Sequence, residues 1–165
     1  MNLDKRSQQI YSSRLRRRRE KPEYLSSDYI VGLTDGEGCF YIETRAPKRA
    51  HKTPRVEMHF YIKMREDELP LLKQIQQFFD CGGVYYQKEY RKNQKACYRF
   101  EIGSQVDIQT KVIPFFDKYP LKSQKLNNYL LFKQVGEIVK KGEHKTSQGF
   151  EKVKQLKLLM NTGAR

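Results

Sequence analysis

Two segments in the first half of the chain alternate between apolar and polar residues. They are residues 39–45 and 55–63, separated by a basic stretch, 46–54, that contains two prolines. A period of two is typical of a β-strand with one buried and one exposed face. The pattern therefore predicts two antiparallel strands joined by a long loop. The expected buried positions are Phe40, Ile42, Val56, Met58, Phe60 and Ile62.

A second alternating pair covers residues 84–90 and 96–102, with a polar turn between them. The returning strand has a clear inward face, but the first strand contains tyrosines that fit either face. We place Tyr86 and Lys88 on the outward face. A one-residue slip in register would expose their neighbours instead, so this assignment stays open at the level of the sequence.

Apolar residues recur at helical spacing in the remaining stretches. The expected helices cover residues 26–37, 67–80, 105–116, 123–139 and 150–160, and we expect Ser123 to cap the fourth of them. Hairpins that alternate with helices in this order indicate an α+β domain. We predict an αββαββα core with a four-stranded antiparallel sheet, helices on one face, and extra C-terminal helices.

The stretch 29–38 is unusual for a helix end. Gly32 and Gly36 lie four residues apart and leave one helix face bare, and each glycine costs roughly 1 kcal/mol of helix stability relative to alanine. Such a pair indicates close packing against another helix. Asp35 and Glu37 lie at the C-terminal end, where the helix dipole favours cations over carboxylates. Acids placed against the local electrostatics indicate a metal site.

Composition narrows the function classes. The 165 residues contain 33 Lys+Arg and 19 Asp+Glu, a net charge of +14, which favours nucleic acid as a partner over an anionic membrane. No apolar run reaches the roughly 20 residues of a spanning helix, and no secretory signal is recognisable. Three scattered cysteines form no C-x-x-C pair, which favours a reducing intracellular compartment. We expect a basic arm (1–24), a core domain (25–140), and a basic link with a final helix (141–165).

The run from Ile30 to Gly38 resembles the motif of the LAGLIDADG homing endonucleases. It keeps the internal glycine, the leucine, the aspartate, the terminal acid and the final glycine. The order of hairpins and helices after it is also that of the family, and the resemblance covers roughly residues 26–140. An EF-hand calcium loop fits less well, because a third oxygen ligand and the distal glutamate are missing. The resemblance implies a saddle-shaped sheet that binds DNA, and a chloroplast or a mitochondrion as the compartment.

The resemblance also implies roles for individual residues. Glu37 corresponds to the last acid of the motif and is expected to be catalytic and to bind Mg²⁺ or another divalent cation, with the Gly36 carbonyl as a further ligand. Lys122 matches a lysine that stabilises charge near the cleft, and Lys125 is the near alternative. Met64 stands where small single-motif members have a glutamine that positions a water, and a thioether cannot replace that amide.

One motif supplies one carboxylate set, whereas a double-strand break needs two hydrolyses. We therefore expect a homodimer whose motif helices cross at an interface of Ile30, Gly32, Leu33 and Gly36. The outward strand residues would lie in the major groove, and loop cations would hold phosphates. The expected DNA-binding residues are Glu43, Arg45, Lys48, Arg49, Lys52, Glu57, His59, Tyr61, Lys63, Arg65, Tyr86, Lys88, Arg91, Lys92, Arg99, Glu101 and Lys125.

The leading hypothesis is a homodimeric, Mg²⁺-dependent, sequence-specific DNA endonuclease that makes a double-strand break at a long pseudo-palindromic site. Two other classes stay open. One is an intron RNA maturase that uses the same basic surface. The other is a non-cleaving nucleic-acid-binding protein, which Met64 favours.

Overall fold

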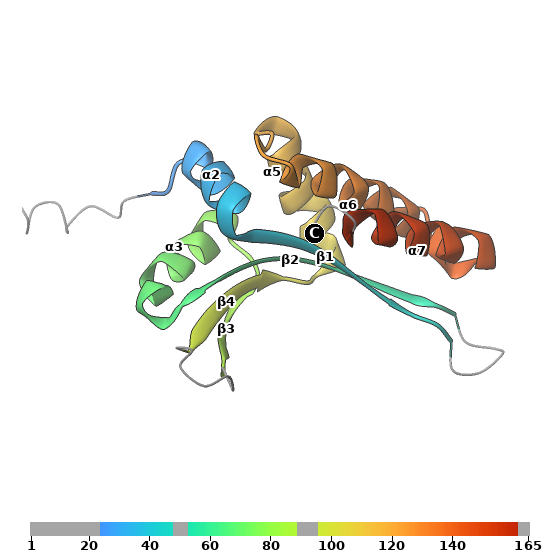
Figure 1. Cartoon of the computed structure of the whole chain (residues 1–165), viewed down its shortest axis with the longest axis horizontal. Helices are drawn as coiled ribbons and strands as arrows, with labels where there is room; N and C mark the ends of the chain where they lie inside the picture. Colours follow the sequence, from blue (N-terminus) through green and yellow to red (C-terminus); the bar gives the residue numbers. More distant parts are fainter. Residues whose placement is uncertain (1–23, 48–52, 89–95, 162–165) are drawn as a thin grey trace, which may run out of the picture.

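The computed structural model describes residues 24–47, 53–88 and 96–161. Strands and helices follow one another in the predicted α+β order (Figure 1). The elements are α2 (Ser27–Glu37), β1 (Gly38–Arg45), β2 (Arg55–Arg65), the 3-10 turn η1 (Glu66–Glu68), α3 (Leu69–Phe79), β3 (Gly83–Gln87), β4 (Cys97–Ile102), α4 (Gln105–Asp107), the π-helical turn η2 (Ile108–Val112), α5 (Ile113–Lys118), α6 (Lys125–Lys140), the 3-10 turn η3 (Glu143–Lys145) and α7 (Ser147–Asn161).

The four strands form one antiparallel sheet in the order β1-β2-β4-β3. Helices α2, α5, α6 and α7 lie above the sheet in Figure 1, and the opposite face is concave and uncovered by them. We call this second face the outer face. Strands β1 and β2 form a long hairpin that runs beneath α6 and α7. The predicted saddle-like sheet is therefore confirmed.

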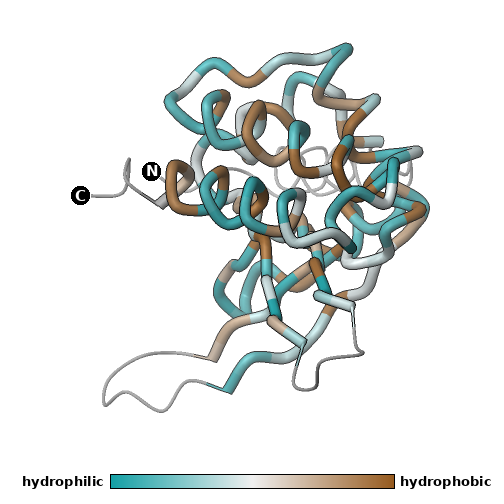
Figure 2. Tube along the Cα trace, turned by 90° about the vertical axis from the view of Figure 1, so that its right-hand side faces the viewer, coloured by the Kyte–Doolittle hydropathy of each residue, from teal (hydrophilic) through white to brown (hydrophobic). Residues whose placement is uncertain are grey.

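The inner face of the sheet carries the apolar positions that the alternation predicted. Phe60 at its centre is fully buried, and its ring lies 5.3–6.5 Å from those of Phe40, Phe79, Phe100 and Phe116. Three of these four pairs are edge-to-face, an arrangement that adds to the stabilisation from burial alone. Along the helices, hydrophobic positions recur between hydrophilic ones (Figure 2). The core thus lies between the inner face and the helices.

The register of β3 differs from our expectation. Tyr85 lies opposite Arg99 and Tyr86 opposite Tyr98, so Tyr86 belongs to the inner face and its ring packs edge-on against Tyr98 at 5.4 Å. The placement of Tyr86 on the outer face was therefore wrong, whereas Lys88 lies just beyond the end of β3 and its placement stays a prediction. The reason is the pairing of Val84 with the buried Phe100, which fixes the apolar side of the strand.

Two helices also differ from the sequence pattern. The segment expected as one helix over 105–116 contains the π-helical turn η2, where the Gln109 side-chain amide donates to the Gly136 carbonyl oxygen (2.9 Å). Helix α6 begins at Lys125 with Gln124 as its N-cap, so the predicted cap, Ser123, lies one position before the observed one, although its hydroxyl accepts from the Lys125 N–H (3.1 Å). Within the described part of the chain, no helix is long and apolar enough to cross a membrane.

Candidate active site and nucleic-acid interface

Helix α2 passes directly into strand β1, and Glu37 is the last helical residue. Gly38 donates its N–H to the Thr34 carbonyl oxygen, and a Cβ at Gly38 would lie 2.5 Å from Thr34 Cγ2. Only glycine therefore fits this junction. The junction fixes the backbone of Glu37, whose side chain is exposed.

Glu37 lines a hollow of about 440 Å³ together with residues of β2, η1 and β4. Met64 is partly buried there, between the exposed cations Lys63 and Arg65. Asp67 and Glu68, with Cys97, complete the lining. The residue that stands in place of the expected glutamine therefore shares a hollow with Glu37.

Asp35 connects the end of α2 to the segment that precedes α6. Its carboxylate accepts hydrogen bonds from the Lys122 N–H (2.9 Å), the Ser123 N–H (3.1 Å) and the Ser123 hydroxyl (2.7 Å). Burial alone would raise the pKa of Asp35, but these hydrogen bonds and the charge of Lys125 outweigh it and hold the pKa below its ordinary 3.8. The contacts agree with a structural role for Asp35.

The two candidate lysines occupy different places. Lys125 Nζ lies 3.4 Å from the Gly36 carbonyl oxygen, within reach of the helix end that carries Glu37. Burial lowers the pKa of Lys125, while the charges of Cys39, Asp35 and Glu37 act in the opposite direction. Lys122 donates its backbone N–H to Asp35, and its side chain is exposed. The structure thus places Lys125, the alternative of the two candidates, next to Gly36.

One strip of α2 is bare. A Cβ placed at Gly32 or Gly36 would meet no described atom within 4 Å, and Tyr29 on the same side is 43% exposed. The glycines therefore do not serve packing within the described part of this chain. Leu33 packs partly against the core, whereas Ile30 is fully buried in it. Our assignment of Ile30 to a dimer interface was wrong, because its side chain already belongs to the core of its own protomer.

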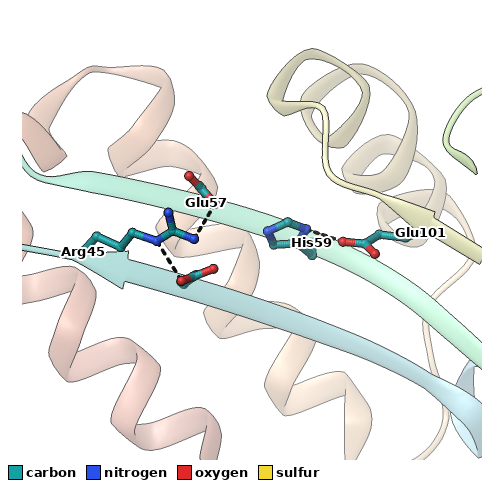
Figure 3. A network of polar contacts seen from close by, with 5 residues as sticks. Arg45, Glu57, His59 and Glu101 are labelled. Carbon is teal, nitrogen blue, oxygen red and sulfur yellow. Dashed lines mark hydrogen bonds and ion pairs between the residues drawn. The ribbon is translucent and has the colours of Figure 1, made fainter. Parts of the chain in front are cut away.

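Charged side chains on the outer face are paired with one another (Figure 3). Arg45 binds Glu43 (2.8 Å) and lies 3.8 Å from Glu57. Glu43 and Glu57 also form, with His59, a group whose potential metal-binding atoms lie within 4.8 Å of one another. The guanidinium of Arg45 already balances these carboxylates, so we do not treat the group as a metal site.

A second network surrounds Glu101. It accepts from His59 Nδ1 (2.6 Å) and from Arg99 (2.7 Å), whose guanidinium carbon lies 5.2 Å from the centre of the Tyr61 ring. Burial, and then a hydrogen bond with Cys39, raise the pKa of Tyr61 to about 12. These contacts join β1, β2 and β4 into one polar surface.

Of the remaining residues expected to bind DNA, two lie on β2 and five lie in loops, and the outer face also carries two residues of β3 that were not expected. Lys63 and Arg65 are exposed on β2, where Arg65 pairs with Asp67 (2.6 Å). Tyr85 and Gln87 share the outer face with Arg99, and the sequence missed them because tyrosines occupy both faces of β3. The loop cations Lys48, Arg49, Lys52, Arg91 and Lys92 lie outside the described residues.

Comparison with known proteins gives a consistent result. The family model described as "LAGLIDADG endonuclease" matches residues 30–136. "Probable intron-encoded endonuclease 2" of Neurospora crassa is 34% identical over 130 residues, which cover 79% of this chain and 26% of that protein. The "Uncharacterized 50.9 kDa protein in ND4 intron 1" of Podospora anserina is 32% identical over 72% of this chain and 25% of that protein. The chain thus spans about a quarter of the length of these relatives.

Solved structures show the same architecture. The homing endonuclease I-TnaI aligns with a TM-score of 0.73 and 32% identity, over 84% of this chain and 90% of that chain. The I-LtrWI LAGLIDADG homing endonuclease, bound to its target DNA, aligns with a TM-score of 0.74 and 32% identity, over 85% of this chain and 45% of that one.

Proposed function

Because this chain belongs to the LAGLIDADG endonuclease family, we propose that it is a sequence-specific DNA endonuclease that makes a metal-dependent double-strand break. One observation carries the proposal: an exposed carboxylate, Glu37, ends a helix whose bare strip is open to a second copy of that helix. Below it, the concave outer face carries the guanidinium groups of Arg45 and Arg99 and the carboxylates that pair with them. Such hydrogen-bond donors and acceptors suit the base edges of the major groove.

Glu37 is the proposed metal ligand, with the Gly36 carbonyl oxygen as a second. Both are hard oxygen donors at an exposed helix end, and such donors suit Mg²⁺ next to a phosphate. The bound ion would activate a water and stabilise the leaving oxygen. Lys125, already close to Gly36, is the better-supported candidate for the cation that stabilises the developing phosphate charge. Lys122 is then proposed to contribute through its backbone bond to Asp35.

The second hydrolysis is proposed to come from a second copy of the chain. Two α2 helices that meet at Gly32 and Gly36 would form an isologous contact, because a two-fold axis places the same strip on both sides. The contact would bring two Glu37 carboxylates together, and metal ions and DNA phosphates would offset their repulsion. Tyr29 and Leu33 would flank the contact.

The test is cleavage of a supercoiled plasmid library that carries a randomised segment, with sequencing of the linear products. We expect Mg²⁺-dependent linear product from the native protein, none with EDTA, and none from Glu37→Gln. Glu137→Gln, which removes an exposed carboxylate on α6, is the matched control and should cut normally. Linear product from Glu37→Gln would refute the catalytic role of Glu37. If the native protein gave no linear product, the proposed endonuclease activity would be refuted.

The dimer has a separate test. Gly32→Leu should leave the protomer folded, since the position is open, but should shift the sedimentation coefficient to that of a monomer and abolish linear product. Lys152→Leu places the same apolar side chain at an exposed position of α7. This control should change neither the sedimentation coefficient nor the yield of linear product. A dimeric Gly32→Leu variant would contradict the proposed interface.

A second candidate function is DNA binding without cleavage, and Met64 beside Glu37 is the observation that favours it. Specific binding of an enriched site without any metal-dependent cut would support this candidate. The relatives are named for introns, and we propose an intron origin for this chain as well, with an organelle as its compartment and intron RNA as a further partner to test.

A further inference from the structure

Glu101 holds the centre of the outer face. One carboxylate oxygen accepts from His59 Nδ1 at 2.6 Å and the other pairs with Arg99 at 2.7 Å. Its side chain is only 17% exposed. Glu101 is one of the expected DNA-binding residues, but a carboxylate with both oxygens engaged and little exposure is poorly placed to accept a hydrogen bond from a base.

Arg99 is held from two sides. Glu101 fixes one end of the guanidinium, and the guanidinium carbon lies 5.2 Å from the centre of the Tyr61 ring. Its side chain nevertheless stays 33% exposed. An arginine whose rotamers are already restricted loses less entropy when it binds a ligand. Its forked donors match the N7 and O6 acceptors of guanine.

The surroundings leave room for this arrangement. A Cβ at Gly103 would lie 3.0 Å from His59 Nδ1, so glycine admits the imidazole beside Glu101. A hollow of about 570 Å³ adjoins Arg99 and Glu101 on the β3 side, lined also by Tyr85, Gln87 and Ser104. The Nε atom of Arg99 is buried without a hydrogen-bond partner, which costs stability in the isolated protein. The contribution of Arg99 to stability alone therefore does not explain this arrangement, which favours a role in binding.

We propose that Arg99 recognises a guanine in the major groove and that Glu101, braced by His59, is a positioning residue that orients Arg99. The inference rests on the proposed DNA recognition and names one base for it. By two-fold symmetry, the guanine would occur once in each half of the target. Arg99 and Glu101 thus act as one unit, and a change in either should affect the same base pair.

The experiment is selection from a randomised duplex pool without divalent metal, so that no strand is cut. The native protein should enrich a site that contains a particular G·C pair. In Arg99→Lys and in Glu101→Gln, the preference for this G·C pair over other base pairs should fall by about 5- to 150-fold. Arg99→Lys keeps the charge, so its affinity for random duplex should stay within about twofold of the native value. Glu151→Gln, on α7, raises the net charge by the same unit as Glu101→Gln and should keep the G·C preference.

The outcomes separate the inference from the function on which it rests. If Arg99→Lys kept the native base preference at every position of the enriched site, the guanine contact would be refuted and the proposed DNA recognition would stand. Loss of a C·G preference in Glu101→Gln, at a position that Arg99→Lys leaves intact, would show that Glu101 reads a base itself and would overturn its positioning role. A native protein that enriches no sequence would overturn the proposed DNA recognition, and the inference with it. Thermal melting of each variant distinguishes loss of specificity from loss of fold.

Discussion

Replacement of Asp35 by asparagine tests how the end of the motif helix is held. Asp35 Oδ1 accepts from the N–H and the hydroxyl of Ser123, and Oδ2 accepts from the Lys122 N–H. Asparagine keeps one acceptor oxygen and places an NH₂ group in the other position. The least damaging orientation sets this NH₂ against the Lys122 N–H, so one hydrogen bond is lost and two become neutral.

The expected cost follows from these three bonds. A hydrogen bond to a charged group contributes about 1.5–3 kcal/mol and a neutral one about 0.5–1.5 kcal/mol. One lost bond and two weakened bonds sum to roughly 4 kcal/mol, and solvent access to the half-buried carboxylate reduces this to about 2–3 kcal/mol. Urea unfolding measures it directly. Asp67→Asn, at an exposed ion pair with Arg65, is the matched control and should cost under about 1 kcal/mol.

The pH dependence gives a second check. Because the folded pKa of Asp35 lies below 3.8, its stabilisation is complete above the unfolded pKa and is lost as pH falls through the folded value. The difference between native and Asp35→Asn proteins should therefore be constant near neutral pH and shrink below about pH 4. A variant no less stable than Asp67→Asn, or a difference that persists undiminished in acid, would refute the reasoning.

Three further predictions concern the core and the outer face. Gly38→Ala should lower the free energy of unfolding in urea by about 2 kcal/mol or more, because the added Cβ would clash with Thr34. Gly32→Ala lies at an open position and should raise the free energy of unfolding of the protomer by up to about 1 kcal/mol. Phe60→Ala should cost about 3–5 kcal/mol in the same assay, and a cost under about 1 kcal/mol would contradict its central place in the core. Tyr61→Phe and the native protein should show the same rise in tyrosinate absorbance up to about pH 11, because burial raises the pKa of the Tyr61 phenol to about 12.

Much of the fold was predictable because its signals are local. Strict alternation identified the inner face of β1 and β2, and helical spacing located the helices within a few residues. The register of β3 was not predictable, since Tyr85 and Tyr86 suit either face and only the pairing of Val84 with Phe100 decides between them. Ile30 was misplaced for a related reason: the apolar residues of α2 lie on several sides, and only the packed structure shows which side is buried.

The placement of Glu37 was predictable from the sequence, and its surroundings were less so. The motif predicts an acid at the junction of helix and strand, and the structure has Glu37 exposed at the end of α2. The choice between Lys122 and Lys125 depends on where α6 begins, and that depends on hydrogen bonds of Asp35 to residues almost ninety positions away. The pairing of Glu101 with Arg99 and His59 depends on cross-strand register as well. No pattern within a single segment contains either contact.

Helix α7 has a consequence for how the protein behaves at high concentration. Among the described strands, β1 is an edge of the sheet with no neighbour on one side, and such edges invite pairing with other chains. Helix α7 lies beside this strand and buries Val153 and Leu156 in the core, with the Lys157 ammonium 5.7 Å from the centre of the Tyr41 ring. The other edge, β3, is only five residues long. Helix α7 thus covers the longer of the two described sheet edges, and we expect removal of α7 to favour aggregation.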